Sequence, residues 1–269
     1  MEILAYDFFQ NALLGSLLAS IACAITGTYV VTRRLVFISG GVTHAAFGGV
    51  GLGMFLGVSP IASAMLFAVA SALGVEWMGR DRRVREDSAI ALFWIVGMSL
   101  GIIFSFLTPG YSSQLSTYLF GNILTVSSTD IIILSLVALL SAAVLFFMHR
   151  AIVSVAFDRE FAASRGVPVV LVECIMMALT AVTIVATLRL VGVVLVISML
   201  TVPVMTAMLF ARSYLTIILW AVPIGFGASL LGLYLSYIAN IPSGATIVLC
   251  SVAIYTLCRC LRRMLSATQ

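Results

Sequence analysis

The sequence predicts an all-α membrane protein, a polytopic bundle of eight to nine transmembrane helices. Hydrophobic residues make up 62% of the chain and charged residues 9%, whereas about a quarter of the residues of a soluble domain are charged. The apolar residues also come in runs of about 20, the length of a helix that crosses a bilayer. With 269 residues, the chain has room for a single transmembrane domain, residues 1–269, and for no soluble domain of useful size.

The basic residues predict the orientation of this bundle. All of them are arginines, and all but Arg189 lie on alternate loops between the apolar runs. Positively charged loops stay in the cytoplasm, so we expect the N terminus outside and the C terminus in the cytoplasm. This placement explains the net charge of +4 without a nucleic-acid partner. Because the sequence has no lysine, it lacks a phosphate-binding loop of the common type, and ATP hydrolysis is expected only on a partner chain.

Nine apolar segments are expected to cross the membrane, an odd number that puts the termini on opposite sides. The last segment is short for a bilayer and the second is rich in glycine, so eight crossings are the alternative. Residues 108–130 are too polar to cross and too apolar for a free loop, which predicts an external or re-entrant helical segment. The expected spans are 8–32, 35–58, 60–79, 88–107, 131–148, 168–188, 191–211, 214–237 and 245–258.

Small residues mark one side of the second span. Gly41, Ala45, Gly49, Gly53 and Gly57 recur at every fourth position, so they form one stripe along a helix. A stripe of small residues allows a neighbouring membrane helix to approach closely. The pattern therefore predicts a packing helix.

A histidine interrupts the same span. His44 lies about ten residues into it, near the middle of the bilayer, where an ionisable residue is costly and usually faces the bundle interior or a water path. Three roles fit: a neutral imidazole bonded to a neighbouring carbonyl, a proton relay, or a transient ligand for a transition metal. The last role fits because the neutral imidazole is the commonest protein ligand of metal ions. The hydroxyls of Ser39 and Thr43 flank it and are candidates to complete a metal path.

A short amphipathic helix is predicted on the cytoplasmic side, near residues 156–167. Asp158 is placed to cap it and Gly166 to end it. Phe157, Phe161 and Ala162 form an apolar face. Such a helix suits the docking of a soluble motor in a groove, and it suits a position on the lipid surface equally well.

Two prolines interrupt later spans. Pro203 lies within the seventh span and Pro223 within the eighth; each removes a backbone hydrogen bond and predicts a kink. Kinked helices suit a path that opens and closes, and packing explains them as well. Glu173 lies near the cytoplasmic end of the sixth span, where we expect a salt bridge to an arginine or a role in an exit path.

Four motifs occur in an order and spacing typical of one family: TYVVTRRLVFISGGVTHAAFGGVGLG, YLFGNILTVSSTD, FDREFAASRGVP and RLVGVVLVISMLTVPVMTA. Over nearly its whole length, the chain resembles the permease subunits of the ABC importers for zinc, manganese or iron(II), the zinc-uptake type in particular. The resemblance implies a multi-pass protein of the inner (plasma) membrane that transports Zn²⁺, or alternatively Mn²⁺ or Fe²⁺, without being an enzyme itself.

The resemblance also implies partners and site residues. It implies a homodimer, a cytoplasmic ABC ATPase that docks on residues 158–166, and an extracytoplasmic metal-binding protein. His44 matches the family's histidine on the metal path. The coupling-helix pattern is matched by Asp158, Glu160, Ala162 and Gly166.

The sequence departs from the family at Gly40, where many members carry an aspartate. One helical turn separates this position from His44, so the usual carboxylate and imidazole would share a face. Losing a hard oxygen ligand weakens the case for manganese more than for zinc. A single imidazole cannot fill a tetrahedral shell, so two histidines facing each other across a dimer, with waters, would form a weak transit site.

Other functions fit the sequence less well. A permease for a metal chelate such as a siderophore is usually longer. An intramembrane enzyme would need a catalytic pair in its spans, and no such pair is present. A proton-coupled carrier would need more buried acids than Glu173 supplies.

Overall fold

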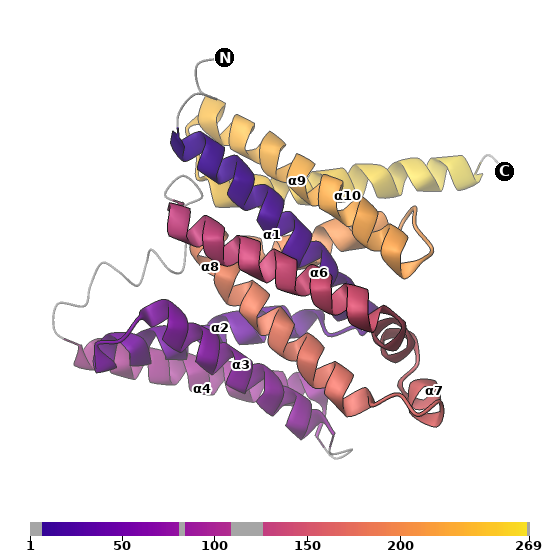
Figure 1. The fold of residues 1–269 in the computed structure, drawn as a ribbon. Coiled ribbons are helices and arrows are strands. Elements are labelled where there is room, and N and C mark those ends of the chain that lie inside the picture. Colours follow the sequence, from indigo (N-terminus) through magenta and orange to yellow (C-terminus); the bar gives the residue numbers. More distant parts are fainter. Residues whose placement is uncertain (1–6, 81–83, 109–125, 268–269) are drawn as a thin grey trace.

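The chain folds into a bundle of α-helices (Figure 1). The computed structural model describes residues 7–80, 84–108 and 126–267, and every regular element in these ranges is a helix, as predicted. Most of the predicted external or re-entrant segment lies outside the described residues, as does the side chain of Arg189. The helices are α1 (Asp7–Thr32), α2 (Val36–Leu56), α3 (Pro60–Gly79), α4 (Glu86–Leu107), α6 (Ser128–Phe157), α7 (Arg159–Ser164), α8 (Val169–Ala207), α9 (Tyr214–Ala239) and α10 (Ser243–Ala267).

Eight helices in the described part of the chain are long and apolar enough to cross a bilayer, which confirms the predicted fold class. The expectation that the last span is short is wrong, because α10 extends from Ser243 to Ala267. The short apolar helix is instead Gly192–Ala207, the second half of α8. Its 16 residues rise only about 24 Å, less than the hydrocarbon core. Whether the crossings number eight or nine therefore depends on this segment.

α8 turns back on itself at Gly192. The φ of 72° and ψ of 171° of this residue lie in a backbone region that essentially only glycine adopts. On α1, Cys23 lies beside Thr187, while Gly27, one turn further on, lies against the Leu200 carbonyl. In an unbroken helix, Thr187 and Leu200 would be about 20 Å apart. Both lie beside the same stretch of α1 because the chain reverses between them, as two separate predicted spans require.

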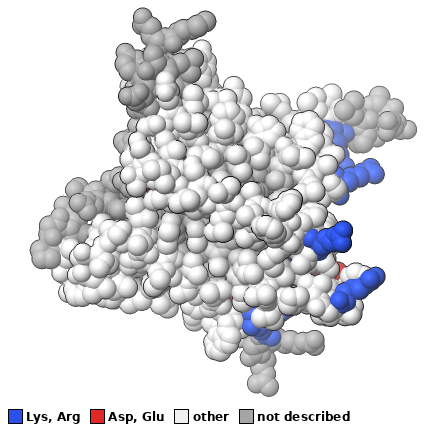
Figure 2. Space-filling view, in the orientation of Figure 1, with Lys and Arg blue, Asp and Glu red and all other residues white. Residues whose placement is uncertain are grey.

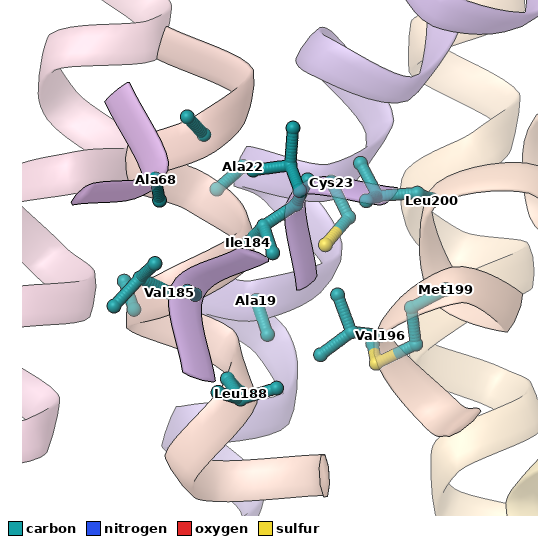
Figure 3. Packing of buried hydrophobic residues seen from close by; sticks show 14 of the residues in the cluster. Ala19, Ala22, Cys23, Ala68, Ile184, Val185, Leu188, Val196, Met199 and Leu200 are labelled. Atoms are coloured by element: carbon teal, nitrogen blue, oxygen red, sulfur yellow. The ribbon is translucent and has the colours of Figure 1, made fainter. Parts of the chain in front are cut away.

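The core lies where α1 meets the two halves of α8 (Figure 3). The side chains on α1 are small, which lets the helices approach closely, and those on α8 are mostly branched and fill the space between them. The labelled core residues on α1 are Ala19, Ala22 and Cys23; those on α8 are Ile184, Val185, Leu188, Val196, Met199 and Leu200. A reversal of α8 at any other residue would misalign these layers.

Replacing Gly192 tests the reversal. We expect Gly192→Ala to destabilise the protein by about 1–3 kcal/mol, because a Cβ disfavours this backbone conformation. Gly227→Ala is the control: Gly227 lies within α9, and an added Cβ would meet no atom within 4 Å. Heating the detergent-solubilised protein and measuring the monodisperse fraction compares the two. Equal melting temperatures would contradict the turn at Gly192.

Candidate metal path and coupling surface

α2 lies between α3 and α4 because its small residues let both helices approach. A Cβ on Gly49 would lie 2.5 Å from the Ser63 carbonyl oxygen of α3, and one on Gly48 would lie 2.8 Å from the Gly97 carbonyl oxygen of α4. These distances are too short for any side chain, so the packing role predicted for this span is confirmed. Gly57 is the exception, because it ends α2 in the left-handed conformation with a φ of 69°.

His44 projects from α2 toward α4, about 12 Å from the start of its helix. Its ring stacks on Trp94 with the ring centroids 4.5 Å apart and the planes at 2°, a contact that the sequence analysis missed. The His44 side chain is half-buried, and its Nδ1 atom is buried with no hydrogen-bond partner in the described part of the chain. An unpaired buried polar atom costs free energy, so this nitrogen is suited to a ligand that comes and goes.

The other two predicted metal ligands are engaged on their own helix. The Ser39 hydroxyl donates to the Val36 carbonyl at 2.6 Å, and the Thr43 hydroxyl donates to the Ser39 carbonyl. Both side chains are buried. No group of three or more His, Cys, Asp or Glu side chains forms among residues 7–80, 84–108 and 126–267. The described chain thus presents His44 as a single imidazole rather than as part of a complete metal shell.

The predicted coupling helix is α7, which is shorter than expected because α6 continues to Phe157. The Asp158 carboxylate caps α7 by accepting a hydrogen bond from the Phe161 backbone N–H at 2.9 Å. Gly166 follows the helix with a φ of 75°, as its predicted role in ending it requires. Glu160 is exposed.

Ala162 does not share the exposed apolar face that was predicted. It is fully buried against the bundle, while Phe157 and Phe161 are 63% and 51% exposed. Ala162 therefore anchors α7, and the two phenylalanines are left on the outside. They border a surface groove lined by His149, Arg150, Val153, Ser154, Phe157, Asp158 and Phe161.

Glu173 forms the salt bridge that the sequence predicted, and it does so with two arginines. Its Oε1 atom accepts a hydrogen bond from Arg33 Nη2 at 2.9 Å, and its Oε2 atom lies 3.2 Å from Arg159 Nη2. The Glu173 side chain is fully buried. Because Arg33 directly follows α1 and Arg159 begins α7, this carboxylate joins three segments that are far apart in the sequence.

Neither of the two prolines that were predicted to kink their spans breaks its helix. α8 continues through Pro203 and α9 through Pro223, and within the described helices the non-helical backbone lies at Gly192 instead. A Cβ on Gly225 would lie 3.4 Å from the Pro203 ring. The second half of α8 thus packs its proline against the glycine that follows Pro223.

The arginines visible on one face of the molecule gather at one end of the bundle (Figure 2). This is the end at which α7 lies and toward which α10 runs (Figure 1). The arginines visible on this face, which lie on separate loops of the sequence, are thus brought to the same end of the bundle.

Known proteins share this architecture over nearly the whole chain. Residues 5–261 match the ABC 3 transport family. The chain is 36% identical to an uncharacterized membrane protein of Synechocystis, over 98% of this chain and 94% of that protein. It is 30% identical to the manganese transport system membrane protein MntC of Halalkalibacterium halodurans, over 95% of this chain and 88% of that one.

A solved structure extends the likeness to three dimensions. A chain in the structure titled "PsaBC from Streptococcus pneumoniae in complex with Fab" superposes with a TM-score of 0.84 at 28% identity, covering 94% of this chain and 91% of that one. The sequence match includes the helices that carry His44, α7 and Glu173. The chain therefore belongs to the ABC 3 transport family, as a membrane permease without a catalytic domain.

Proposed function

We propose that this chain is the membrane permease of an ATP-driven importer of a divalent metal ion, and that the ion is Mn²⁺. The observation that carries the proposal is the 30% identity, over 95% of the chain, to a protein named as a manganese transport permease. The bundle with its half-buried His44 supports it. The sequence favoured Zn²⁺ because Gly40 replaces a carboxylate; the named relatives favour the manganese alternative, and Fe²⁺ and Zn²⁺ become outcomes of the test.

The proposed assembly is a homodimer. One chain offers a single imidazole on the proposed path, that of His44, whereas a transition metal requires at least four ligands. A second copy would supply a second His44, and waters would fill the remaining positions. Such a site binds weakly, which suits an ion that must be released.

The arginine-rich end of the bundle is assigned to the cytoplasm by the positive-inside rule, with the N terminus outside. This orientation brings α7 and its groove to the side where ATP is available. The half-exposed Phe157 and Phe161 suit an apolar contact with a cytoplasmic ABC ATPase. The exposed Asp158 and Glu160 supply negative charge beside that contact. An extracytoplasmic metal-binding protein would deliver the ion at the opposite end.

The test is uptake of radiolabelled Mn²⁺ into proteoliposomes that contain the permease with its ABC ATPase and the extracytoplasmic metal-binding protein. We expect uptake that requires ATP and a working ATPase, with unlabelled Zn²⁺ and Fe²⁺ competing less well than Mn²⁺. Stronger competition by Zn²⁺ than by Mn²⁺ would identify Zn²⁺ as the transported ion. Uptake that persists with an inactive ATPase would overturn the importer itself.

Gly40 provides a test of metal preference. A Cβ at this position would meet the Ile197 side chain at 3.6 Å, an ordinary contact, so a small side chain fits. We expect Gly40→Asp to strengthen competition by Mn²⁺ relative to Zn²⁺ by about tenfold, because a carboxylate one turn from His44 is a hard ligand. Gly40→Asn is the control of similar shape without charge. An equal effect of the two variants would show that shape rather than charge matters.

A further inference from the structure

A charged cluster lies where α7 meets the membrane helices, and the proposed metal path does not account for it. Glu173 of α8 is its centre, with Arg33, which directly follows α1, and Arg159 of α7 on its two oxygens. Glu76 of α3 is a direct neighbour of Glu173 and pairs with Arg80 at 3.5 Å. The cluster therefore connects α7 to three membrane helices.

The two arginines hold Glu173 unequally. Arg33 donates a hydrogen bond at 2.9 Å and its side chain is only 14% exposed. Arg159 lies 3.2 Å from Oε2 and its side chain is 39% exposed, but that oxygen has no partner with hydrogen-bond geometry in the described part of the chain. Charge-assisted hydrogen bonds are the stronger contacts. Arg33 is thus the fixed partner, and Arg159 is the one that can withdraw.

Withdrawal of Arg159 would have an electrostatic consequence for the bundle. Glu173 is fully buried and adjoins a second carboxyl group, that of Glu76. Withdrawing Arg159 would leave Arg33 as the one arginine on Glu173, and Oε2 would face a second carboxyl group inside the bundle with no cation beside it, which is unfavourable. A rearrangement of the ends of α1, α3 and α8 that restores a partner or admits water would relieve this cost.

α7 is a short capped helix that is fastened to α8. Asp158 caps its first turn, and Ala162 attaches it to the apolar cluster that contains Val169 and Val172 of α8. A displacement of α7 therefore carries its first residue, Arg159, with it. The guanidinium group of Arg159 reaches inward to the Glu173 carboxylate while the adjacent Glu160 is exposed.

We propose that Arg159 is a positioning residue for transport: its ion pair with Glu173 transmits movement of α7 to α1, α3 and α8. The inference rests on the proposed function, because the movement of α7 would come from a docked ATPase. A purely structural ion pair would fasten α7 to the bundle and would affect the stability of the protein or its assembly with the ATPase. A transmitting ion pair affects the number of ions moved for each ATP hydrolysed.

The experiment measures ATP hydrolysis and Mn²⁺ uptake on the same proteoliposomes, with the full permease and its ATPase. We expect Arg159→Gln to keep the ATPase bound and hydrolysing while uptake per ATP falls about tenfold, and Arg159→Lys to recover part of the loss. Arg212→Gln is the control, because Arg212 is an exposed arginine between α8 and α9, outside residues 158–166, and it should keep wild-type uptake per ATP.

A double-variant comparison separates the linkage from general damage. Adding Arg159→Gln to Glu173→Gln should lower uptake per ATP no further than Glu173→Gln alone, because the carboxylate that Arg159 pairs with is already gone. Glu173→Gln by itself also removes the partner of Arg33. Wild-type uptake per ATP in Arg159→Gln, or a double variant in which the two losses multiply, would overturn the linkage and leave the importer intact. Absence of ATP-dependent uptake in the wild-type complex would instead overturn the proposed function, and the inference with it.

Discussion

Replacing His44 with alanine is expected to lower metal uptake by about tenfold or more while the complex continues to hydrolyse ATP. His44 is the ionisable residue within α2, and its Nδ1 atom is buried without a partner in the described chain. Removing it takes away the imidazole on the proposed path but leaves α7 and its cluster untouched. Uptake of labelled Mn²⁺ and release of phosphate, measured on the same proteoliposomes, separate the two effects.

The control for His44→Ala is Phe55→Ala on the same helix. Phe55 lies at the other end of α2 and is 46% exposed, so its loss tests whether any large truncation of α2 stops transport. We expect uptake close to wild type in this variant. If His44→Ala also transports normally, the histidine is a packing residue that rests on Trp94, and the metal must follow another route.

Trp94→Phe tests the stacked ring in the same assay. Since the Trp94 ring is parallel to the His44 ring, it restricts the imidazole to one orientation. A phenylalanine keeps an aromatic face but covers less of the imidazole, so we expect a loss of uptake of about twofold to fivefold, smaller than that of His44→Ala. A loss as large as that of His44→Ala would indicate that orientation, rather than the presence of the ring, limits transport.

The sequence was sufficient for features that depend on local composition. Runs of apolar residues predicted the spans, and the spacing of Asp158 and Gly166 predicted the limits of a short helix, because caps act within a few residues. The glycines of α2 predicted close helix packing because their spacing, too, is a local feature of the sequence. Their division between α3 and α4 depends on which helices surround α2, and that was not predictable from their spacing.

Features that join distant segments were only partly predictable. An arginine partner for Glu173 was expected from its depth in the membrane, but nothing in the sequence selects Arg33 and Arg159 among the arginines at that end. Trp94 lies on α4, and its contact with His44 exists because Gly48 and Gly97 let the two backbones approach. The prolines were predicted to interrupt the later helices, whereas α8 actually reverses at Gly192, in a backbone conformation that essentially only glycine adopts.

Adding a single methyl group at Gly27 is expected to have the largest effect on the fold. A Cβ there would lie 2.1 Å from the Leu200 carbonyl oxygen and 3.0 Å from its carbonyl carbon. These atoms belong to the backbone of the second half of α8, so no change of rotamer relieves the clash. We expect Gly27→Ala to destabilise the protein by about 3 kcal/mol or more, seen as a lower melting temperature and a smaller monodisperse fraction in detergent.

The control and a second variant identify the source of the clash at Gly27. Gly225→Ala, whose Cβ would come no closer than 3.4 Å to the Pro203 ring, should retain most of the stability. The double variant Gly27→Ala/Leu200→Ala shortens the Leu200 side chain. It should not regain the stability lost in Gly27→Ala, because the obstructing atom is the Leu200 carbonyl oxygen. A rescued double variant would place the side chain of Leu200, not its backbone, against α1. A Gly27→Ala protein with wild-type stability would mean that the second half of α8 can move away from α1 at little cost, and the contact would then belong to one state of a moving helix.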